Sequence, residues 1–149
     1  MKEIDFALLK DELTAALKKI SEIVVSTSCN DIVTSRTVFC SSDGSAVYFI
    51  TSRAYTKYKQ IVKNPNVALC RDNIQITGRA EILGHPSSIN LKFENEEAGK
   101  YISHYSRYKN TVMIKVVPAK IVLYRGKGIY DYCDLETGKA MRKGRESSE

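Results

Sequence analysis

Residues 48–69 constrain the fold more than any other stretch, because they have the pattern of a strand, a turn, a short helix and a second strand. Val47 to Ile50 is an unbroken apolar and aromatic run, which is typical of a strand. The segment after the turn has one apolar helical stripe, formed by Tyr58, Ile61 and Val62. Pro65 ends this helix, because the residue before a proline is disfavoured in helical angles.

The turn inside this stretch has the groups that a phosphate needs. Thr51 and Ser52 place two hydroxyls at the end of the strand, and Lys57 lies in the first turn of the helix. Residues 51–71 contain five basic side chains and no acidic one. Hydroxyls, free amide N–H groups at a helix start and a lysine bind phosphate well. An ordinary connection with a solvated basic face explains the same residues, so this stretch alone leaves both interpretations open.

Arg36 is the second feature that points to an anion. Residues 32–40 are predicted to form a strand, and alternation puts Arg36 on the same face as Val38 and Cys40. A guanidinium on a largely apolar face is costly unless an anion meets it. A salt bridge to an internal carboxylate is the alternative, but neither neighbouring strand supplies an obvious one. Arg36 therefore favours an anionic ligand.

Length and charge narrow the class of protein. The 149 residues are predicted to form a single domain, with residues 140–149 or so as a mobile tail. The net charge is +6, and most of the excess lies in residues 51–71. A local excess fits a small phosphorylated ligand better than a nucleic-acid track. No secretory signal pattern and no apolar run of membrane-spanning length is present, so we expect a cytoplasmic protein with no membrane partner.

The four cysteines do not have the spacing of a metal site or a redox motif. No CxxC pattern occurs, and Cys40 and Cys70 lie inside strand-like runs. Buried thiols are therefore expected at these two positions, and no metal site is predicted.

The remaining pattern predicts a mainly β fold with flanking helices, in which about six strands form an antiparallel barrel. The first strands are joined by hairpins, and no regular alternation of strand and helix follows. Gly78 interrupts the strand 73–83 and indicates a bulge or a close backbone approach. Two further strands are expected at 111–117 and 120–124, on either side of Pro118. The tyrosines of a helix that begins near residue 95 are expected in the core or at an interface.

The order of six short motifs resembles the FMN-binding split-barrel superfamily of pyridoxamine 5'-phosphate oxidase. These motifs are Ser35-Arg36-Thr37-Val38, Asp43-Gly44, Tyr48-Phe49-Ile50-Thr51, Thr56-Lys57, Asn64-Pro65-Asn66-Val67-Ala68-Leu69 and Gly78-Arg79-Ala80. The resemblance covers roughly residues 5–124, and the specificity lies in the order and spacing of the motifs. It implies a six-stranded split barrel that forms a homodimer, with one FMN in each of two clefts at the subunit interface.

The resemblance also implies which residues hold the flavin. Arg36 matches an arginine that reaches the flavin phosphate, whereas Thr37 and Val38 match residues whose backbone lines the isoalloxazine ring. Ile50 and Thr51 match the pair at the end of the third strand, and Thr56 and Lys57 match the helix-start pair of the phosphate site. Asn73 matches a position where some members place a glutamine against the polar edge of the ring. The Ser52 hydroxyl adjoins this set.

One departure from the family bears on the reaction. Pyridoxamine 5'-phosphate oxidases end in a signature with arginine and histidine that holds the substrate phosphate, and residues 125–149 contain no histidine. The chain is therefore more similar to the general-stress-protein and nitroimidazole-reductase-type branches. We expect an FMN-dependent oxidoreductase that acts on a small molecule, and no catalytic residue is predicted. A non-catalytic flavin-binding stress or redox-sensing protein is the alternative.

Overall fold

The computed structural model describes residues 1–91 and 95–144. Its strands are β1 (Lys2–Ile4), β2 (Glu22–Cys29), β3 (Ile32–Phe39), β4 (Ser41–Asp43), β5 (Ala46–Ser52), β6 (Asn66–Arg71), β7 (Ile74–Gly84), β8 (Thr111–Gly126), β9 (Ile129–Asp134) and β10 (Lys139–Lys143). Its helices are α1 (Phe6–Lys18), α2 (Thr56–Lys63), α3 (Glu96–Tyr105) and the 3-10 turn η1 (Pro86–Ser88). The prediction of a mainly β fold with flanking helices is confirmed. The prediction of six strands is wrong, because the described residues form ten.

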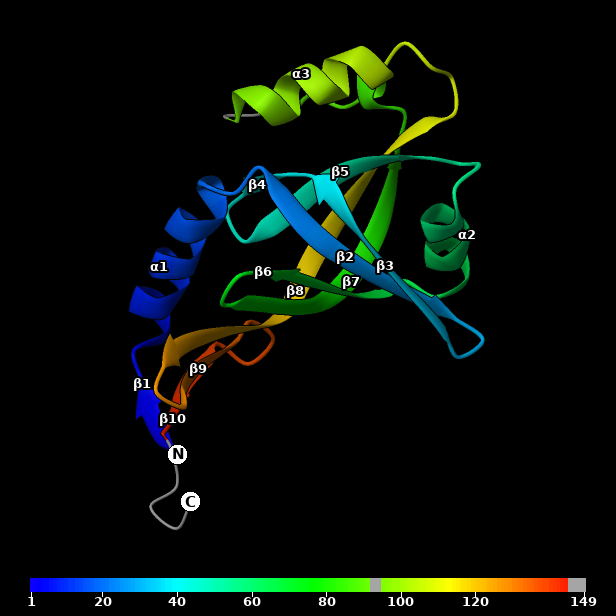
Figure 1. Ribbon diagram of the computed structural model, residues 1–149. Helices are drawn as coiled ribbons and strands as arrows, with labels where there is room; N and C mark the ends of the chain where they lie inside the picture. The colour runs from blue at the N-terminus through cyan, green and yellow to red at the C-terminus, as the bar shows by residue number, and fades with distance from the viewer. Residues whose placement is uncertain (92–94, 145–149) are drawn as a thin grey trace.

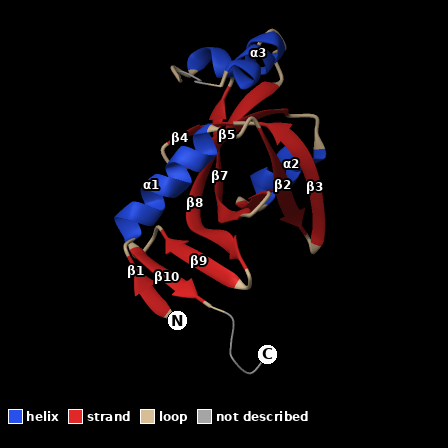
Figure 2. Cartoon of the chain, turned by 60° about the vertical axis from the view of Figure 1, so that its left-hand side comes forward, coloured by secondary structure: helices blue, strands red, loops and turns tan. Residues whose placement is uncertain are grey.

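All strand pairs are antiparallel, and the sheet bends around a core without closing (Figures 1 and 2). The strand order is β1-β10-β9-β8-β7-β6-β2-β3, and β5 pairs with both β4 and β8. Within the described part of the chain, no ladder joins β3 to β5, so the barrel is split between these two strands. Helix α3 crosses the end of the barrel near this split, and α2 lies beside β2 (Figure 1).

Strand β5 is buried on both faces, which explains why its sequence does not alternate. Val47 and Phe49 belong to the main core inside the barrel. Tyr48 and Ile50 point the other way and pack with Ile102 of α3 and with neighbouring residues in a second core cluster. The apolar run that opens the most constraining stretch of the sequence therefore fills two cores at once.

Gly78 lies at a bulge in the pairing of β7 with β8. Gly78 pairs with Pro118, and the register shifts between Thr77 and Gly78. A glycine permits the backbones to approach this closely, so the predicted close approach is confirmed. The two strands predicted on either side of Pro118 are in fact one continuous strand, β8, because the bulge accommodates the proline.

Three strands at the chain ends were not predicted. β1 pairs with β10, and β10 pairs with β9, so residues 139–143 are part of the sheet rather than of a tail. Asp131 at the centre of β9 is fully buried, and its carboxylate accepts hydrogen bonds from Arg125 and Arg142. Residues 145–149 of the expected tail lie outside the described part of the chain.

Two further findings concern the burial of the cysteines and whether a helix could span a membrane. Cys40 is buried, as expected, but Cys70 is exposed on β6, so the prediction of a buried thiol there is wrong. Cys70 falls on the outward side of the alternating burial pattern of β6, which faces away from the core. Among the described residues, no helix has the length and apolarity needed to cross a membrane.

Candidate functional site

A cavity of about 230 Å³ opens where the barrel is split. It lies between β3, the end of β5, the start of α2 and one side of α3. Six of the nine predicted site residues line it: Thr37, Val38, Ile50, Thr51, Ser52 and Lys57. These residues come from β3 and from the adjoining elements β5 and α2, and the missing ladder between β3 and β5 leaves room for the cavity.

Arg36 lies beside this cavity, and neutral oxygen atoms hold its guanidinium. Nη1 donates to the carbonyl oxygen of Val25 at 3.2 Å and to Oγ1 of Thr27 at 2.9 Å, and Nη2 donates to Oγ1 of Thr34. A guanidinium has five N–H donors. Two donors of Arg36, on Nε and Nη2, therefore have no acceptor among the described residues, and they remain available to an anion.

Lys57 adds a second cation at the same end of the cavity. Burial lowers the pKa of Lys57, and the nearby positive charge of Arg36 lowers this pKa further. Burial likewise lowers the pKa of Arg36. In the described part of the chain, no carboxylate lies within 4.0 Å of either side chain. Two partly buried cations without a carboxylate form a site that favours an anion.

The start of α2 also favours an anion. Tyr55 is the N-cap residue and makes no side-chain cap hydrogen bond, and the first backbone bond of the helix runs from Lys59 to Tyr55. The amide N–H groups of the first turn therefore lack an intrahelical acceptor. At the neighbouring end of β5, the Oγ1 atom of Thr51 is buried and has no hydrogen-bond partner in the part of the chain that the structure describes. Unpaired amides, a free hydroxyl and two cations match a phosphate group.

Tyrosines form the rest of the wall, and sequence reasoning did not assign them to the site. Tyr55, Tyr101 and Tyr105 line the cavity. The ring centroids of Tyr101 and Tyr105 are 4.6 Å apart, and Phe39 lies 4.6 Å from Tyr101. The spacing of Tyr101 and Tyr105, one helical turn apart, was the available signal, but it equally suits a core or an interface.

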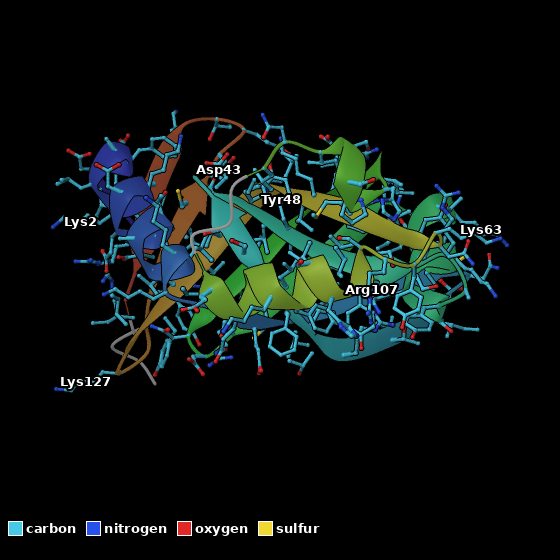
Figure 3. All side chains as sticks on the ribbon, turned by 90° about the horizontal axis from the view of Figure 1, so that it is seen from above. Lys2, Asp43, Tyr48, Lys63, Arg107 and Lys127 are labelled. Atoms are coloured by element: carbon cyan, nitrogen blue, oxygen red, sulfur yellow. The ribbon has the colours of Figure 1, made fainter. Side chains whose placement is uncertain are left out.

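A second cavity of about 420 Å³ continues this cleft toward the segment that follows α3. It shares Ser52, Tyr55, Tyr105 and Thr111 with the first cavity and is also lined by Tyr108 and Lys109. Arg107 lies over the ring of Tyr108 at 5.7 Å from its centroid, and Figure 3 shows it on the side of α3 that faces α2. Among residues 1–91 and 95–144, no acidic side chain is in the wall of either cavity. The cleft as a whole is aromatic and electropositive.

Two predicted residues are not in the cavity wall. Thr56 is the first residue of α2, and its side chain is exposed. Asn73 is exposed in the turn between β6 and β7, where its Nδ2 donates to the carbonyl oxygen of Tyr124 at 3.0 Å. The structure therefore does not bring Asn73 to the other predicted residues, and the contact of Asn73 with a flavin remains a prediction.

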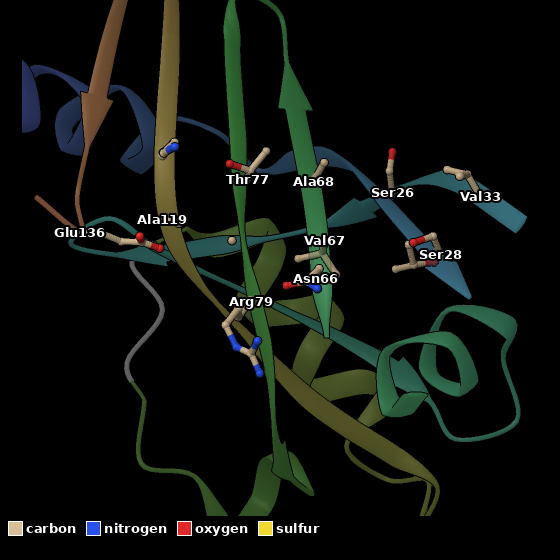
Figure 4. A pocket seen from close by; sticks show the side chains of 13 residues that line it. Ser26, Ser28, Val33, Asn66, Val67, Ala68, Thr77, Arg79, Ala119 and Glu136 are labelled. Carbon is tan, nitrogen blue, oxygen red and sulfur yellow. The ribbon is translucent and has the colours of Figure 1, made fainter. Parts of the chain in front are cut away.

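A larger hollow of about 610 Å³ lies on the outer face of the sheet (Figure 4). Ser26, Ala68 and Thr77 line it from neighbouring strands, with Arg79 and Glu136 at its margins. None of the nine predicted residues lines this hollow, and its wall contains a carboxylate. The cleft at the split between β3 and β5 is thus the better candidate for an anionic ligand. Among the described residues, no group of three or more His, Cys, Asp or Glu side chains could hold a metal ion.

Comparison with known proteins identifies the fold. No family model and no curated protein matches the chain. General Stress Protein 26 from Bacillus anthracis superposes with a TM-score of 0.64 at 26% identity, over 85% of this chain and 98% of that one. A pyridoxamine 5'-phosphate oxidase-related, FMN-binding protein from Nostoc punctiforme superposes with a TM-score of 0.56 at 12% identity, over 94% of this chain and 95% of that one.

A FAD-binding protein from Mesorhizobium loti gives a TM-score of 0.56 at 13% identity, over 74% of this chain and 89% of that one. Similarity at such low identity shows the fold alone. These proteins are of the kind that the six sequence motifs resemble. The chain therefore has the fold of the pyridoxamine 5'-phosphate oxidase-like split-barrel superfamily.

Proposed function

We propose that the cleft between β3 and β5 binds FMN. The observation that carries this proposal is the pair of cations, Arg36 and Lys57, which meet no described carboxylate and lie beside the uncapped start of α2. The phosphate would take the unused donors of Arg36, Lys57 and the first amides of α2, together with the hydroxyls of Thr51 and Ser52. The isoalloxazine ring would lie along Thr37 and Val38, within reach of the tyrosines.

We further propose that two copies of the chain complete each cleft. Thr37 and Tyr105 are exposed although they line the cavity, so one side of the cleft faces solvent in a single subunit. Asn73 lies in a different part of the same subunit, and a homodimer would allow Asn73 of a second copy to reach the ring. Cytoplasmic localisation and the small-molecule partner remain predictions from the sequence.

The chemistry of the site depends on the cofactor and on what the chain arranges around it. Bound FMN supplies hydride or electron transfer, and the protein supplies orientation, electrostatics and access. Burial raises the pKa of Tyr101, and the neighbouring Tyr105 and Tyr55 raise it further, so its phenol stays protonated near neutral pH. Tyr101 can therefore donate a hydrogen bond into the cleft. The arrangement supports an FMN-dependent oxidoreductase that passes electrons to a small-molecule acceptor.

The ion pairs of the last strands argue against a pyridoxamine 5'-phosphate oxidase activity. Arg125 donates to Asp131 at 2.8 Å and to Glu12 at 2.5 and 2.7 Å, and Arg142 donates to Asp131 at 2.7 Å. Internal carboxylates thus already engage both arginines, which are then poor ligands for a substrate phosphate.

A non-catalytic flavin-binding stress or redox-sensing protein is the second candidate, and the likeness to General Stress Protein 26 favours it. Steady-state assays of the FMN-loaded protein with NADH or NADPH and a panel of quinone, nitroaromatic and ferricyanide acceptors distinguish the two. Turnover well above that of free FMN supports the oxidoreductase. Flavin that remains bound but turns over no faster than free FMN supports the non-catalytic protein.

A further inference from the structure

Gln60 is a buried polar residue of α2 whose side chain reaches across to β2 and β3. Only 7% of Gln60 is exposed. Its Nε2 donates to the carbonyl oxygen of Ile32 at 3.2 Å. Because a carbonyl oxygen can only accept, this contact fixes the orientation of the amide. The amide oxygen Oε1 must then face the two threonine hydroxyls on the other side.

The hydroxyls of Thr27 and Thr34 both donate to this amide oxygen. The distances from Oε1 of Gln60 are 2.5 Å to Oγ1 of Thr27 and 2.6 Å to Oγ1 of Thr34. Each hydroxyl has a single proton, so the lone pairs of both oxygens face away from Gln60. These lone pairs accept hydrogen bonds from Nη1 and Nη2 of Arg36. The direction of every bond in the chain from Arg36 to Gln60 is thus determined.

This network joins Arg36 to the helix that carries Lys57, the second cation of the proposed phosphate site. Arg36 is held at its Nη atoms, which leaves donors on Nε and Nη2 for a ligand. Lys57 precedes Gln60 by three residues, so both lie on the same side of α2 about one turn apart. The amide that orients the acceptors of Arg36 therefore also anchors the helix that carries Lys57.

We propose that Gln60 is a positioning residue for a phosphate monoester: it orients the hydroxyls of Thr27 and Thr34 and thereby fixes Arg36 opposite Lys57. This inference rests on the proposed binding of FMN. Gln60 does not touch the ligand, and its effect depends on the phosphate and not on the flavin ring.

The test compares the affinities of FMN and riboflavin, which lacks the phosphate, by flavin fluorescence titration of wild-type protein and variants. Gln60→Met keeps the length of the side chain and removes the acceptor oxygen. We expect it to weaken FMN by about five- to tenfold, the scale of one hydrogen bond between neutral groups, and riboflavin by less than about twofold. Thr27→Val should give a similar ratio, whereas Thr27→Ser, which keeps the hydroxyl, should bind FMN as the wild type does.

Asn64→Ala is the matched control for simple anchoring of the helix. Asn64 ends α2 and its Nδ2 donates to Oγ of Ser28 on β2 at 3.1 Å, but it has no hydrogen bond to Arg36 or to either threonine. We expect this variant to leave the FMN-to-riboflavin ratio unchanged. The double variant Thr27→Val with Gln60→Met should lose no more than either single variant, because both act through the same chain of hydrogen bonds.

Nuclear magnetic resonance of the Arg36 side chain tests the positioning role of Gln60 without flavin. Separate, slowly exchanging Nη signals of Arg36 are expected in the wild type and in Asn64→Ala, and averaged signals in Gln60→Met. Unchanged Nη signals in Gln60→Met, or equal losses of FMN and riboflavin affinity, would overturn the positioning role. A wild-type protein that binds neither flavin contradicts the proposed function instead, and the arginine signals still decide the role of Gln60.

Discussion

Gly78 of β7 lies directly against the backbone of Val117 of β8. A Cβ atom at position 78 would be 2.3 Å from the carbonyl oxygen of Val117 and 2.9 Å from Cα of Pro118. Both contacts are with backbone atoms, so they cannot be relieved by a change of side-chain rotamer. The bulge that joins the two strands therefore depends on glycine at this position.

We predict that Gly78→Ala lowers the free energy of unfolding by about 2–3 kcal/mol, because the strands must separate locally. Chemical denaturation monitored by circular dichroism measures this. Gly99→Ala is the control, since among the described residues no atom outside the local backbone of α3 lies within 4 Å of a Cβ at that position. It should stabilise the protein by about 0.5–1 kcal/mol through helix propensity. Equal stability of wild type and Gly78→Ala would contradict the close approach.

The bulge also illustrates what the sequence could predict. An isolated glycine in a strand pattern indicated a close approach correctly, because that signal is local. Strand β9 was missed because one of its two buried positions is taken by Asp131, whose charge gave residues 125–149 the pattern of a solvated tail. The arginines that neutralise Asp131 come from β8 and β10, and no local pattern shows that pairing.

The cleft likewise combines residues that a local sequence pattern predicts with residues that only the tertiary packing brings in. Thr51, Ser52 and Lys57 were predicted from one strand–turn–helix segment, and all three line the cavity. Tyr101 and Tyr105 reach the same wall from α3, about fifty residues later in the chain, and only the packing of α3 over the split barrel brings them there. Asn73 lines neither cavity, and only in the proposed homodimer would it reach the cleft, from a second copy of the chain.

We predict that Asp131→Asn lowers the free energy of unfolding by about 3 kcal/mol, because two arginines would lose the buried charge that neutralises them. Hydrogen bonds from Arg142, and from Arg125, hold the pKa of Asp131 below its ordinary value of 3.8. The resulting stabilisation is present above the unfolded-state pKa and is lost as the pH falls through the lower folded-state pKa. Chemical denaturation between pH 7 and pH 2 should show that the free energy of unfolding falls toward acid pH in the wild type and falls less in the variant.

Glu12→Gln is the control for the same network. The Glu12 side chain is 47% exposed at the outer end, so its removal should cost less than about 1 kcal/mol. If Asp131→Asn cost no more than Glu12→Gln, the buried carboxylate would not have the stabilising role inferred here.

We predict that Arg36→Ala and Lys57→Ala each weaken FMN binding by about 1.5–3 kcal/mol, the scale of a charge-assisted hydrogen bond, and weaken riboflavin much less. Lys63→Ala, which removes an exposed lysine at the other end of α2, should affect neither ligand. Isothermal titration calorimetry with both flavins measures the difference. Equal losses for FMN and riboflavin would mean that Arg36 and Lys57 act through folding.

The pH dependence of the FMN affinity provides a second test of the role of Lys57. Its pKa in the free protein is lowered, first by burial and then by Arg36, and a bound phosphate should raise it. FMN affinity should therefore fall as the pH rises through this lowered pKa, below 10.5, and Lys57→Arg should remove the fall. Riboflavin corrects for ionisation of the flavin ring itself. The same fall in Lys57→Arg would exclude Lys57 as its source.

We predict that the protein is a homodimer and that FMN stabilises the dimer, because a ligand bound across two subunits favours assembly by mass action. Sedimentation velocity across a dilution series, with and without FMN, measures the monomer fraction. The onset of dissociation should shift to lower protein concentration when FMN is present. A monomer that retains FMN at full occupancy would contradict the shared cleft.

We predict that the cleft recognises FMN through its terminal phosphate. Titration of the apoprotein with FMN, riboflavin and FAD under the same conditions tests it most directly. We expect FMN to bind most tightly, because Arg36, Lys57 and the start of α2 serve one terminal phosphate, and the sequence contains no GxGxxG fingerprint for a dinucleotide. FAD or riboflavin binding as tightly as FMN, or no flavin binding at all, would contradict it.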